Sequence, residues 1–462
     1  MTNVTQLWET AKNKRLHCLI VTLDVKNAFN TLTWHSIIRA IKNRDLDECT
    51  RNIIRDYLRN RKIRYKINET WYTWNVYGGV PQGSVLGPTL WNIVYDGLLT
   101  RKMPRGVKII GYADDVALIV SSKTIQGIQN DLKEAMEGIT GWFDEEGLQL
   151  AHEKTEMVLL TGRRVKGDLP GAEMKYLGVT LDMKRTFAPH VDKAVNKATR
   201  LMAALTPLLP NHGGPGQKSR KLYEAVWCAV ALYGAPIWGT PALERGTRRR
   251  ALSTTAYEAA CVLAGVLPVH LRVKERVRWY KNVRDSRAKD LPSGGDGREK
   301  ERTALRENIM TLWQTEWSEF NDRNWTKRLI PDIKVWLGCR GQGNIDYHLA
   351  QLLTGHGVFN EYRVRIGKSQ DLACWDCGWE EDNAEHVLLS CPRWDKERAI
   401  LEKTLGARLS IHDLVKRAGL SDENWKEFQN FARITMDSRI QKENELQKIE
   451  RLQATSAPSR RG

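Results

Sequence analysis

Three short apolar segments next to acidic residues constrain the fold of this chain most. Leu16–Leu23 has the composition of a buried strand and is followed at once by Asp24. Val107–Tyr112 and Val116–Ser121 are also apolar, and an Asp-Asp pair lies between them. This pattern predicts a β-hairpin with an acidic tip. A carboxylate at the end of a buried strand is costly without a partner, so these residues need protons, cations or water beside them.

The acidic pair consists of Asp114 and Asp115. On its own, such a pair is usually a polar turn, and that interpretation stays open. Brought close to Asp24, the carboxylates would repel one another unless they bound protons or divalent cations. One or two carboxylates together with substrate phosphates are the ligands that Mg²⁺ prefers. Two such ions stabilise the attacking and leaving oxygens of phosphoryl transfer, so the second interpretation is a two-metal catalytic site.

A segment rich in glycine and proline, residues 78–88, lies between the acidic elements. Its glycines would let the backbone approach a flat or charged ligand closely. Gln82, which Gly83 follows, is able to hydrogen-bond a nucleotide through both ends of its amide. The helix predicted over Val85–Leu99 would present free N–H groups to an anion. An ordinary turn before a core helix explains the same segment, so both interpretations stay open.

The charge balance favours a polyanionic partner. The chain has 72 Lys and Arg against 55 Asp and Glu, a net charge of +17. Nucleic acid fits this bias better than a membrane, because we find no lipidation motif and no basic amphipathic anchor. The longest apolar stretch, Ala225–Trp238, is shorter than the roughly 20 residues of a membrane span. The N-terminal segment Met1–Lys14 has no apolar signal core, so we expect an intracellular protein.

Three of the eight cysteines form a pattern with a histidine. The pattern is Cys374-x2-Cys377-x8-His386-x4-Cys391. Three thiolates and one imidazole at this spacing suit one tetrahedral Zn²⁺ ion without an open coordination position, which is typical of a structural site. Scattered buried thiols are the alternative. Disulfides are not expected for the other cysteines of an intracellular protein.

Basic residues gather early in the chain. Arg51, Arg55 and Arg59 recur every four residues, so they share one face of a predicted helix. Further basic residues follow at once, namely Arg61, Lys62, Arg64 and Lys66. Contact with a nucleic-acid backbone and a solvated surface explain this pattern equally well.

The order of these motifs resembles that of a known family. The strand ending at Asp24 continues to Ala28-Phe29, and is followed by Pro81–Ser84 and then by Tyr112–Asp115. The similarity continues through Gly147–Leu150 and Lys154–Glu156 to Met174–Val179. The chain resembles the palm of reverse transcriptases. It is most similar to those of non-LTR, LINE-type retrotransposons of insects, of the jockey and ribosomal-DNA-inserting kinds.

This resemblance assigns roles to the acidic residues. It implies that Asp24 and Asp114 hold two catalytic Mg²⁺ ions and that the backbone carbonyl of Val25 completes one site. Asp115 would lie beside them and orient the primer end. Lys154 would protonate the pyrophosphate leaving group, although a surface lysine before a strand is an equally good interpretation.

The resemblance also implies a nucleotide site and a primer grip. Phe29 would pack under the sugar and exclude a 2′-hydroxyl, so that dNTPs are preferred. Gln82 and Gly83 would contact the incoming nucleotide and the templating base pair. Tyr176 and Leu177 would position the primer strand.

The implied fold is α+β, with five regions. Residues 1–183 would form a right-hand polymerase palm, a small antiparallel sheet backed by helices, with residual fingers. A helical thumb over 184–270, a basic helical linker over 271–345 and a zinc-knuckle module over 346–400 would follow. Residues 401–462 would form a charged helical tail with a disordered end.

The implied activity is that of an RNA-directed DNA polymerase acting in target-primed retrotransposition. It would add dNTPs to a primer 3′-hydroxyl on an RNA template, with DNA as primer and target, in the nucleus. Only 23 residues precede Asp24, so we expect an N-terminally truncated relative that lacks most of the fingers. The alternative is therefore a catalytically incomplete remnant that binds nucleic acid. A group II intron maturase or telomerase-like enzyme fits less well, because the Cys-Cys-His-Cys pattern is not expected there. The sequence leaves the oligomeric state open.

Overall fold

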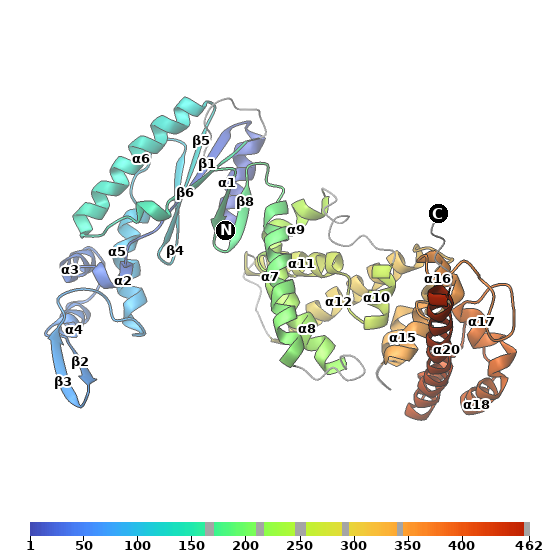
Figure 1. Cartoon of the computed structure of the whole chain (residues 1–462). Coiled ribbons are helices and arrows are strands. Elements are labelled where there is room, and N and C mark those ends of the chain that lie inside the picture. Colours follow the sequence, from blue (N-terminus) through green and yellow to red (C-terminus); the bar gives the residue numbers. More distant parts are fainter. Residues whose placement is uncertain (162–170, 209–216, 245–255, 289–294, 340–344, 457–462) are drawn as a thin grey trace. The chain divides into compact units, whose positions relative to one another are not determined.

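The computed structural model describes the chain except for residues 162–170, 209–216, 245–255, 289–294, 340–344 and 457–462 (Figure 1). The described residues divide into two compact units, Met1–Asp192 and Lys193–Gly462. We describe each unit by itself. Residues 457–462, which belong to the end predicted to be disordered, lie outside the described residues.

The first unit is built on a four-stranded antiparallel sheet with the order β4-β5-β1-β6. The strands are β1 (His17–Leu23), β4 (Val107–Tyr112), β5 (Asp115–Ser122) and β6 (Glu156–Leu160). β1 pairs with β5 on one side and with β6 on the other, so it is an interior strand of the sheet. All its residues but Thr22 are buried, which explains why its sequence is a continuous apolar run.

Helices supply the rest of the core of this unit. Residues of β1 and β5 share one buried cluster with residues of α5 and α6, and α1 packs against β1 and β5. Thr124 caps α6, since its hydroxyl accepts a hydrogen bond from the Gly127 N–H at 3.0 Å. The helices are α1 (Thr2–Asn13), α2 (Ala28–Thr31), α3 (Trp34–Lys42), α4 (Glu48–Leu58), α5 (Leu86–Leu99) and α6 (Ile125–Glu146), with the 3₁₀ helix η1 (His152–Lys154).

Two small hairpins complete the first unit. β2 (Lys62–Ile67) pairs with β3 (Thr70–Asn75), and every residue of both strands is exposed. β7 (Glu173–Tyr176) pairs with β8 (Val179–Asp182), and these strands are largely buried. The two residues at each turn have positive φ angles, the geometry of a two-residue hairpin turn that matches the twist of the strands.

All elements described in the second unit are helical. One buried cluster runs from Ala259 to Met436 and holds much of this unit together. The helices are α7 (Ala188–Leu205, which begins in the first unit), η2 (Thr206–Leu208), α8 (Gln217–Ala231), α9 (Ala235–Glu244), α10 (Ala256–Ala264), α11 (Val269–Ala288), α12 (Gly295–Ser318), α13 (Trp325–Leu329), α14 (Ile333–Cys339), α15 (Tyr347–Thr354), α16 (Asn360–Arg365), α17 (Ala384–Leu389), η4 (Pro392–Trp394), α18 (Asp395–Leu405), α19 (Leu414–Ala418) and α20 (Asp422–Ser456).

The mixture of sheet and helices agrees with the predicted α+β class. The described residues of the predicted linker, 271–345, are largely helical, and some of them are also part of the core. Leu305, Ile309 and Trp313 of α12 are buried in the same cluster as Cys374 and Cys391. The many charged residues of α11 and α12 mask these buried apolar residues in the composition. The finer boundaries at 270, 345 and 400 stay predictions.

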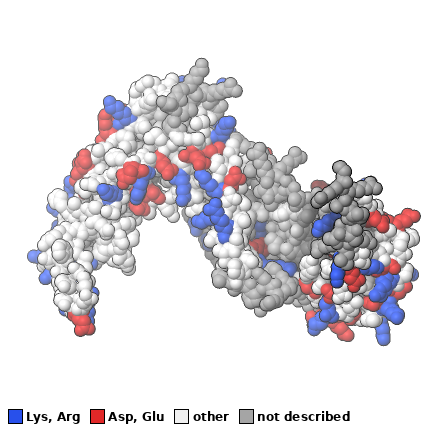
Figure 2. Space-filling view, in the orientation of Figure 1, with Lys and Arg blue, Asp and Glu red and all other residues white. Residues whose placement is uncertain are grey.

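Charged side chains of both signs are interspersed over the visible face of the described residues (Figure 2). Among those residues, no single helix is both long and apolar enough to cross a membrane. One pair, Ser219–Ala231 with Ala235–Glu244, meets the length and composition together but is bent by 87°.

Gly111 of β4 tests how closely α5 packs on the sheet. A Cβ atom at this position would lie 2.7 Å from Cε1 and 2.8 Å from Oη of Tyr95, which is buried. We therefore expect Gly111→Ala to lower the free energy of unfolding of the full chain by about 1–3 kcal/mol, measured by chemical denaturation. Gly138→Ala is the matched control, because it lies inside α6 with open space around the new Cβ atom. It should be neutral or stabilising by roughly 0.5–1 kcal/mol. An equal loss in both variants would contradict this account.

Candidate active site and Cys/His cluster

Strand register sets Asp24 beside Asp115, and Lys154 contacts Asp24 from the 3₁₀ helix η1. Leu23 of β1 pairs with Val116 of β5, so the same register continued by one residue sets Asp24 opposite Asp115. On the other side of β1, η1 precedes β6, and Val25 forms a bridge with Leu150. The Lys154 Nζ atom lies 2.7 Å from Oδ2 of Asp24, which forms an ion pair. Asp24, Asp115 and Lys154, which are far apart in sequence, thus meet at one end of the strands. We call this region, together with Asp114 at the hairpin tip, the acidic edge.

Helix α5 holds the tip of the β4–β5 hairpin in place. The turn consists of Ala113 and Asp114, and Ala113 has a positive φ of 54°. The indole N–H of Trp91 donates a hydrogen bond to the Ala113 carbonyl at 3.4 Å, and the Tyr95 hydroxyl donates to the Asp115 carbonyl at 3.3 Å. The apolar pattern of this helix predicted a core element and gave no sign of these two contacts.

The three carboxylates influence one another. Burial raises the pKa of Asp115, and the nearby Asp114 and Asp24 carboxylates raise it further. The hydrogen bond from Lys154 to Asp24 raises the pKa of the ammonium group, which therefore keeps its charge.

The carbonyl group of Val25 is free to accept a ligand. The backbone on either side of it is engaged, since Ala151 N–H donates to the Asp24 carbonyl at 2.9 Å and Lys26 N–H donates to the Gln149 carbonyl at 2.8 Å. The Val25 carbonyl accepts no hydrogen bond from the described residues. This geometry fits the ligand role that the resemblance implies for Val25.

Phe29 links the glycine-rich segment to the hairpin tip. The Val80 N–H donates a hydrogen bond to the Phe29 carbonyl at 2.7 Å. The ring of Phe29 lies 5.6 Å from that of Trp91, the residue that also contacts the tip. Gly79 has a φ of 78°, and a Cβ atom there would lie 3.0 Å from the Phe29 carbonyl oxygen. A glycine is required at this close approach.

Gln82 and Gly83 are exposed in the turn that precedes α5. Ser84 caps the helix, because its hydroxyl accepts a hydrogen bond from the Gly87 N–H at 3.0 Å and donates to the Pro81 carbonyl at 2.8 Å. Gly83 has a φ of 82° with open space around it. No hydrogen bond joins Gln82 to the aspartates within the described part of the chain, so its predicted role stays a prediction.

Tyr176 and Leu177 lie where β7 turns into β8. Tyr176 is buried, and its hydroxyl has no hydrogen-bond partner among the described residues. Burial raises the pKa of Tyr176 to about 12, and the Asp115 carboxylate contributes to this increase. Leu177 occupies the turn, with a φ of 46°. Their predicted contact with a primer stays a prediction.

The four residues of the Cys/His pattern converge in the second unit. The ligand atoms of Cys374, Cys377, His386 and Cys391 all lie within 4.8 Å of one another. The Nδ1 atom of His386 lies 3.2 Å from the Ser390 hydroxyl, so Nε2 is the nitrogen that faces the thiols. A hydrogen bond with Cys391 lowers the pKa of the Cys374 thiol. The donor set and its spacing fit a tetrahedral metal ion.

A buried arginine fixes this cluster to the C-terminal helix α20. Arg439 is only 1% exposed, and its guanidinium group pairs with Asp376 at 2.9 Å and with Asp382. It also donates to the Val358 carbonyl at 2.8 Å. Lys442 pairs with Asp376 as well, at 3.0 Å. Sequence reasoning missed Arg439, since one arginine in a highly charged helix gives no sign of burial.

The arginines predicted to share a helix face lie on α4 or directly after it. Arg51 donates to the Arg44 carbonyl at 3.1 Å, and Arg55 donates to the Asn52 side chain at 2.6 Å. Both contacts are local, and both arginines remain partly or fully exposed. The structure is therefore consistent with either interpretation of this face.

The hairpin β2–β3 has two different faces. Cross-strand pairing places an apolar set on one face, namely Ile63, Tyr65, Ile67, Tyr72 and Trp74. The other face carries Lys62, Arg64, Lys66 and Trp71, and the Arg64 guanidinium lies 4.6 Å from the Trp71 ring. Trp74 is 68% exposed and Trp71 is 55% exposed. Exposed aromatic rings beside cations are typical of surfaces that bind single-stranded nucleic acid.

Comparison with known proteins identifies the first unit. Residues 1–181 match the family model described as "Reverse transcriptase (RNA-dependent DNA polymerase)". A Candida tropicalis telomerase in complex with a fragment of telomeric RNA is similar at 11% identity. The match covers 66% of this chain and 52% of that one, with a TM-score of 0.35.

Curated relatives extend beyond the first unit. A putative 115 kDa protein in the type-1 retrotransposable element R1DM of Drosophila melanogaster is 27% identical over 401 residues, covering 80% of this chain and 39% of that protein. A Pol polyprotein from the type-1 retrotransposable element R1 2 of Nasonia vitripennis is 26% identical, covering 75% of this chain and 92% of that protein. The RNA-directed DNA polymerase of the Drosophila melanogaster mobile element jockey is 26% identical, covering 59% of this chain and 30% of that protein. The chain thus spans about two fifths of the first of these relatives. Residues 1–181 are thus similar to the reverse transcriptase family, and the relatives of the longer chain come from R1- and jockey-type non-LTR retrotransposons.

Proposed function

We propose that the chain is an RNA-directed DNA polymerase of a non-LTR retrotransposon. It adds dNTPs to the 3′-hydroxyl of a DNA primer on an RNA template, in target-primed retrotransposition. The observation that carries the proposal is the register of β1, which gathers Asp24 and Asp115 beside Asp114 at the hairpin tip, in a chain of this family. Because the target is chromosomal DNA, we propose that the protein acts in the nucleus.

The acidic edge fits two Mg²⁺ ions. Asp24 and Asp114 supply carboxylate oxygens, and the Val25 carbonyl is free to join them, a set of oxygen donors that hard cations prefer. When bound, the ions supply charge neutralisation at the reacting phosphate. Asp115 lies beside this set, where it adds negative charge and orients the primer end.

The remaining residues form the nucleotide and primer sites in this proposal. Phe29 packs against Trp91, which makes it a rigid floor under the sugar and disfavours a 2′-hydroxyl. Gln82 and Gly83 contact the incoming nucleotide and the templating pair from the exposed turn before α5. Tyr176 and Leu177 position the primer. The exposed aromatic and basic residues of the β2–β3 hairpin support contact with template RNA.

A catalytically incomplete remnant that binds nucleic acid is the other function considered. It predicts nucleic-acid binding without synthesis. The intact set of acidic residues and the relatives named as RNA-directed DNA polymerases favour the polymerase.

Loss of one carboxylate separates the two functions. Asp114→Asn keeps the size of the side chain and removes its charge. We expect primer extension on an RNA template with dNTPs and Mg²⁺ to fall by more than about 10²-fold, since a metal contact contributes several kcal/mol to catalysis. RNA binding, measured by fluorescence anisotropy, should remain. Asp144→Asn, an exposed aspartate of α6, is the control and should extend normally. Binding without extension in the wild type as well would support the remnant.

Lys154 offers a second test, because its ion pair with Asp24 competes with a metal ion. Lys154→Met should lower the Mg²⁺ concentration that gives half-maximal extension. If Lys154 also protonates pyrophosphate, the maximal rate should fall by about 10²-fold or more. Lys154→Arg should restore the ion pair but not the proton donor. Lys133→Met on α6 controls for loss of one exposed positive charge. An unchanged rate in Lys154→Met would exclude the proton donor, and an unchanged Mg²⁺ dependence would exclude the competition.

We also propose that the Cys/His cluster binds one structural Zn²⁺ ion. Four donors close together, of which Cys374 and Cys391 belong to the buried cluster of the second unit, support a structural site. Binding would add folding free energy to the C-terminal part of the second unit.

Metal content and stability test this site together. Cys377→Ser should lose the zinc that copurifies with the full chain, measured by mass spectrometry, and should lower its thermal stability. Treatment of the wild type with a chelator should have the same effect. Cys49→Ser is the matched control, since Cys49 is also an exposed free thiol but lies on α4. Equal zinc content in both variants would refute the site.

A further inference from the structure

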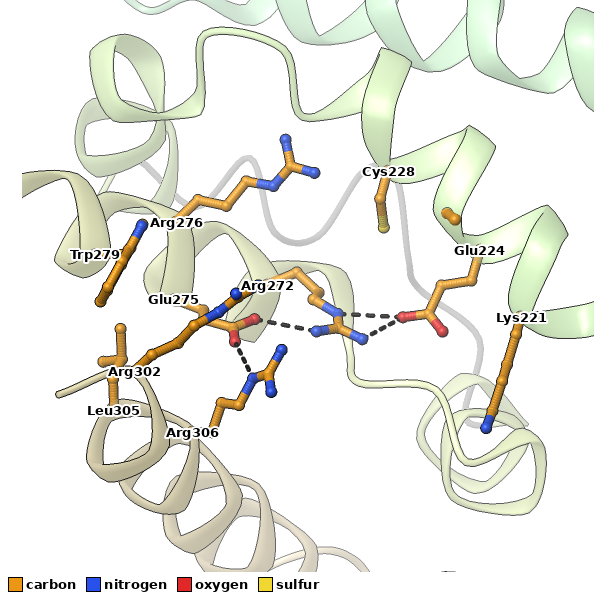
Figure 3. A pocket seen from close by; sticks show the side chains of 11 residues that line it. Lys221, Glu224, Cys228, Arg272, Glu275, Arg276, Trp279, Arg302, Leu305 and Arg306 are labelled. Carbon is orange, nitrogen blue, oxygen red and sulfur yellow. Dashed lines mark hydrogen bonds and ion pairs between the residues drawn. The ribbon is translucent and has the colours of Figure 1, made fainter. Parts of the chain in front are cut away.

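A cationic cavity lies within the second unit, and none of the residues assigned a role so far lines it. Its volume is about 430 Å³, and α8, α11 and α12 supply its lining (Figure 3). Five of the lining residues are basic, namely Lys221, Arg272, Arg276, Arg302 and Arg306. Two are acidic, Glu224 and Glu275, so three positive charges are in excess.

Arg272 takes up both carboxylates. Its Nε atom lies 3.1 Å from Oε1 of Glu224, and its Nη1 atom lies 3.1 Å from Oε2 of Glu275 (Figure 3). The Nε atom of Arg306 lies 3.9 Å from Glu275, which is too long for a hydrogen bond. The two carboxylates therefore hold Arg272, and Glu275 also forms a longer ion pair with Arg306. The remaining lining cations, Lys221, Arg276 and Arg302, have no carboxylate partner among the described residues.

The other basic residues keep donors for a ligand. Arg276 uses one nitrogen on the Leu232 carbonyl, at 3.1 Å. Arg302 and Lys221 form no ion pair with the described residues. In Figure 3, Arg302 and Arg306 rise from α12 toward Glu275 and Arg272 of α11. Like charges gathered in one cavity repel one another, and an anion bound among them would remove this cost.

The volume of the cavity and its apolar lining residues indicate which kind of anion it binds. Trp279 is half-buried and Leu305 is buried, and both line the cavity. The volume falls in the range of about 300–1,000 Å³ found for small-molecule sites, so there is room for more than a single ion. Guanidinium groups bind phosphate through paired hydrogen bonds, and an indole ring offers a surface for a base.

We propose that this cavity binds one nucleotide of a single-stranded nucleic acid. Arg276, Arg302 and Arg306 hold its phosphate, and Trp279 contacts its base. The inference rests on the proposed function only for the class of its ligand, because no catalytic residue takes part in it. The site adds a contact for the nucleic-acid strand in the helical second unit.

A charge-matched pair of variants of the full chain tests the site. Arg302→Ala/Arg306→Ala removes two exposed cations from the cavity. Arg298→Ala/Lys300→Ala removes two exposed cations from the same helix, and neither of them lines the cavity. Thermal unfolding should show that both variants fold. Affinity for a labelled single-stranded RNA is then measured by fluorescence anisotropy over a series of salt concentrations.

We expect weaker binding in the cavity variant than in the control. The slope of log K against log salt should become less steep by about 0.7 for each phosphate of a single strand that the variant no longer neutralises. The control should keep the wild-type slope. Equal slopes in both variants would overturn the proposal, because they would mean that only diffuse charge is involved.

Two further measurements are needed. One distinguishes a free nucleotide from an RNA strand as the ligand of the cavity, and the other distinguishes the cavity proposal from the polymerase proposal. If a nucleoside monophosphate stabilises the wild type but not the cavity variant, and both bind RNA equally, the cavity takes free nucleotides and the strand contact is wrong. Primer extension by the wild type is measured separately from RNA binding. Its failure would refute the polymerase, whereas the difference in salt slope between the cavity variant and its control tests the cavity alone.

Discussion

The antiparallel register of β1 between β5 and β6 is the constraint on which the acidic edge depends. Side chains alternate between the two faces of a strand, so a shift of one residue would turn every buried side chain of β1 to the opposite face. Burial on both faces fixes the strand, and Asp24, one residue beyond it, is fixed as well. Asp115 follows from the register with β5, and Lys154 reaches Asp24 with its side chain from η1, directly before β6. The apolar residues of the strand thus determine where the charged ones meet.

Helix α5 adds a second constraint on the same edge. Trp91 contacts the hairpin tip and the ring of Phe29, and the Tyr95 ring lies 5.5 Å from that of Trp91. Buried indole and phenol groups need hydrogen-bond partners, and here the carbonyl groups of the turn provide them. The packing of helix α5 therefore fixes the position of Phe29 relative to the turn that contains Asp114.

The sequence predicted the elements of this edge because each is a short apolar run next to an acidic turn, which local patterns describe well. Val107–Tyr112 agrees with β4, and the Cys/His spacing agrees with the cluster around His386. The ion pair of Lys154, the buried Arg439 and the cationic cavity could not be predicted. Each depends on which charged side chains tertiary folding brings together, and composition describes only how many there are.

The exposed β2–β3 hairpin has a consequence for the behaviour of the protein in solution. Both of its outer edges are open in the described structure, and one of its faces is apolar and aromatic. Such a ribbon is a template for pairing with a second chain. Lys62, Arg64 and Lys66 alternate along β2, and charges on an edge strand oppose that pairing. The same three side chains that suit an RNA backbone therefore also oppose pairing between the hairpins of neighbouring protein copies while no RNA is bound to the hairpin.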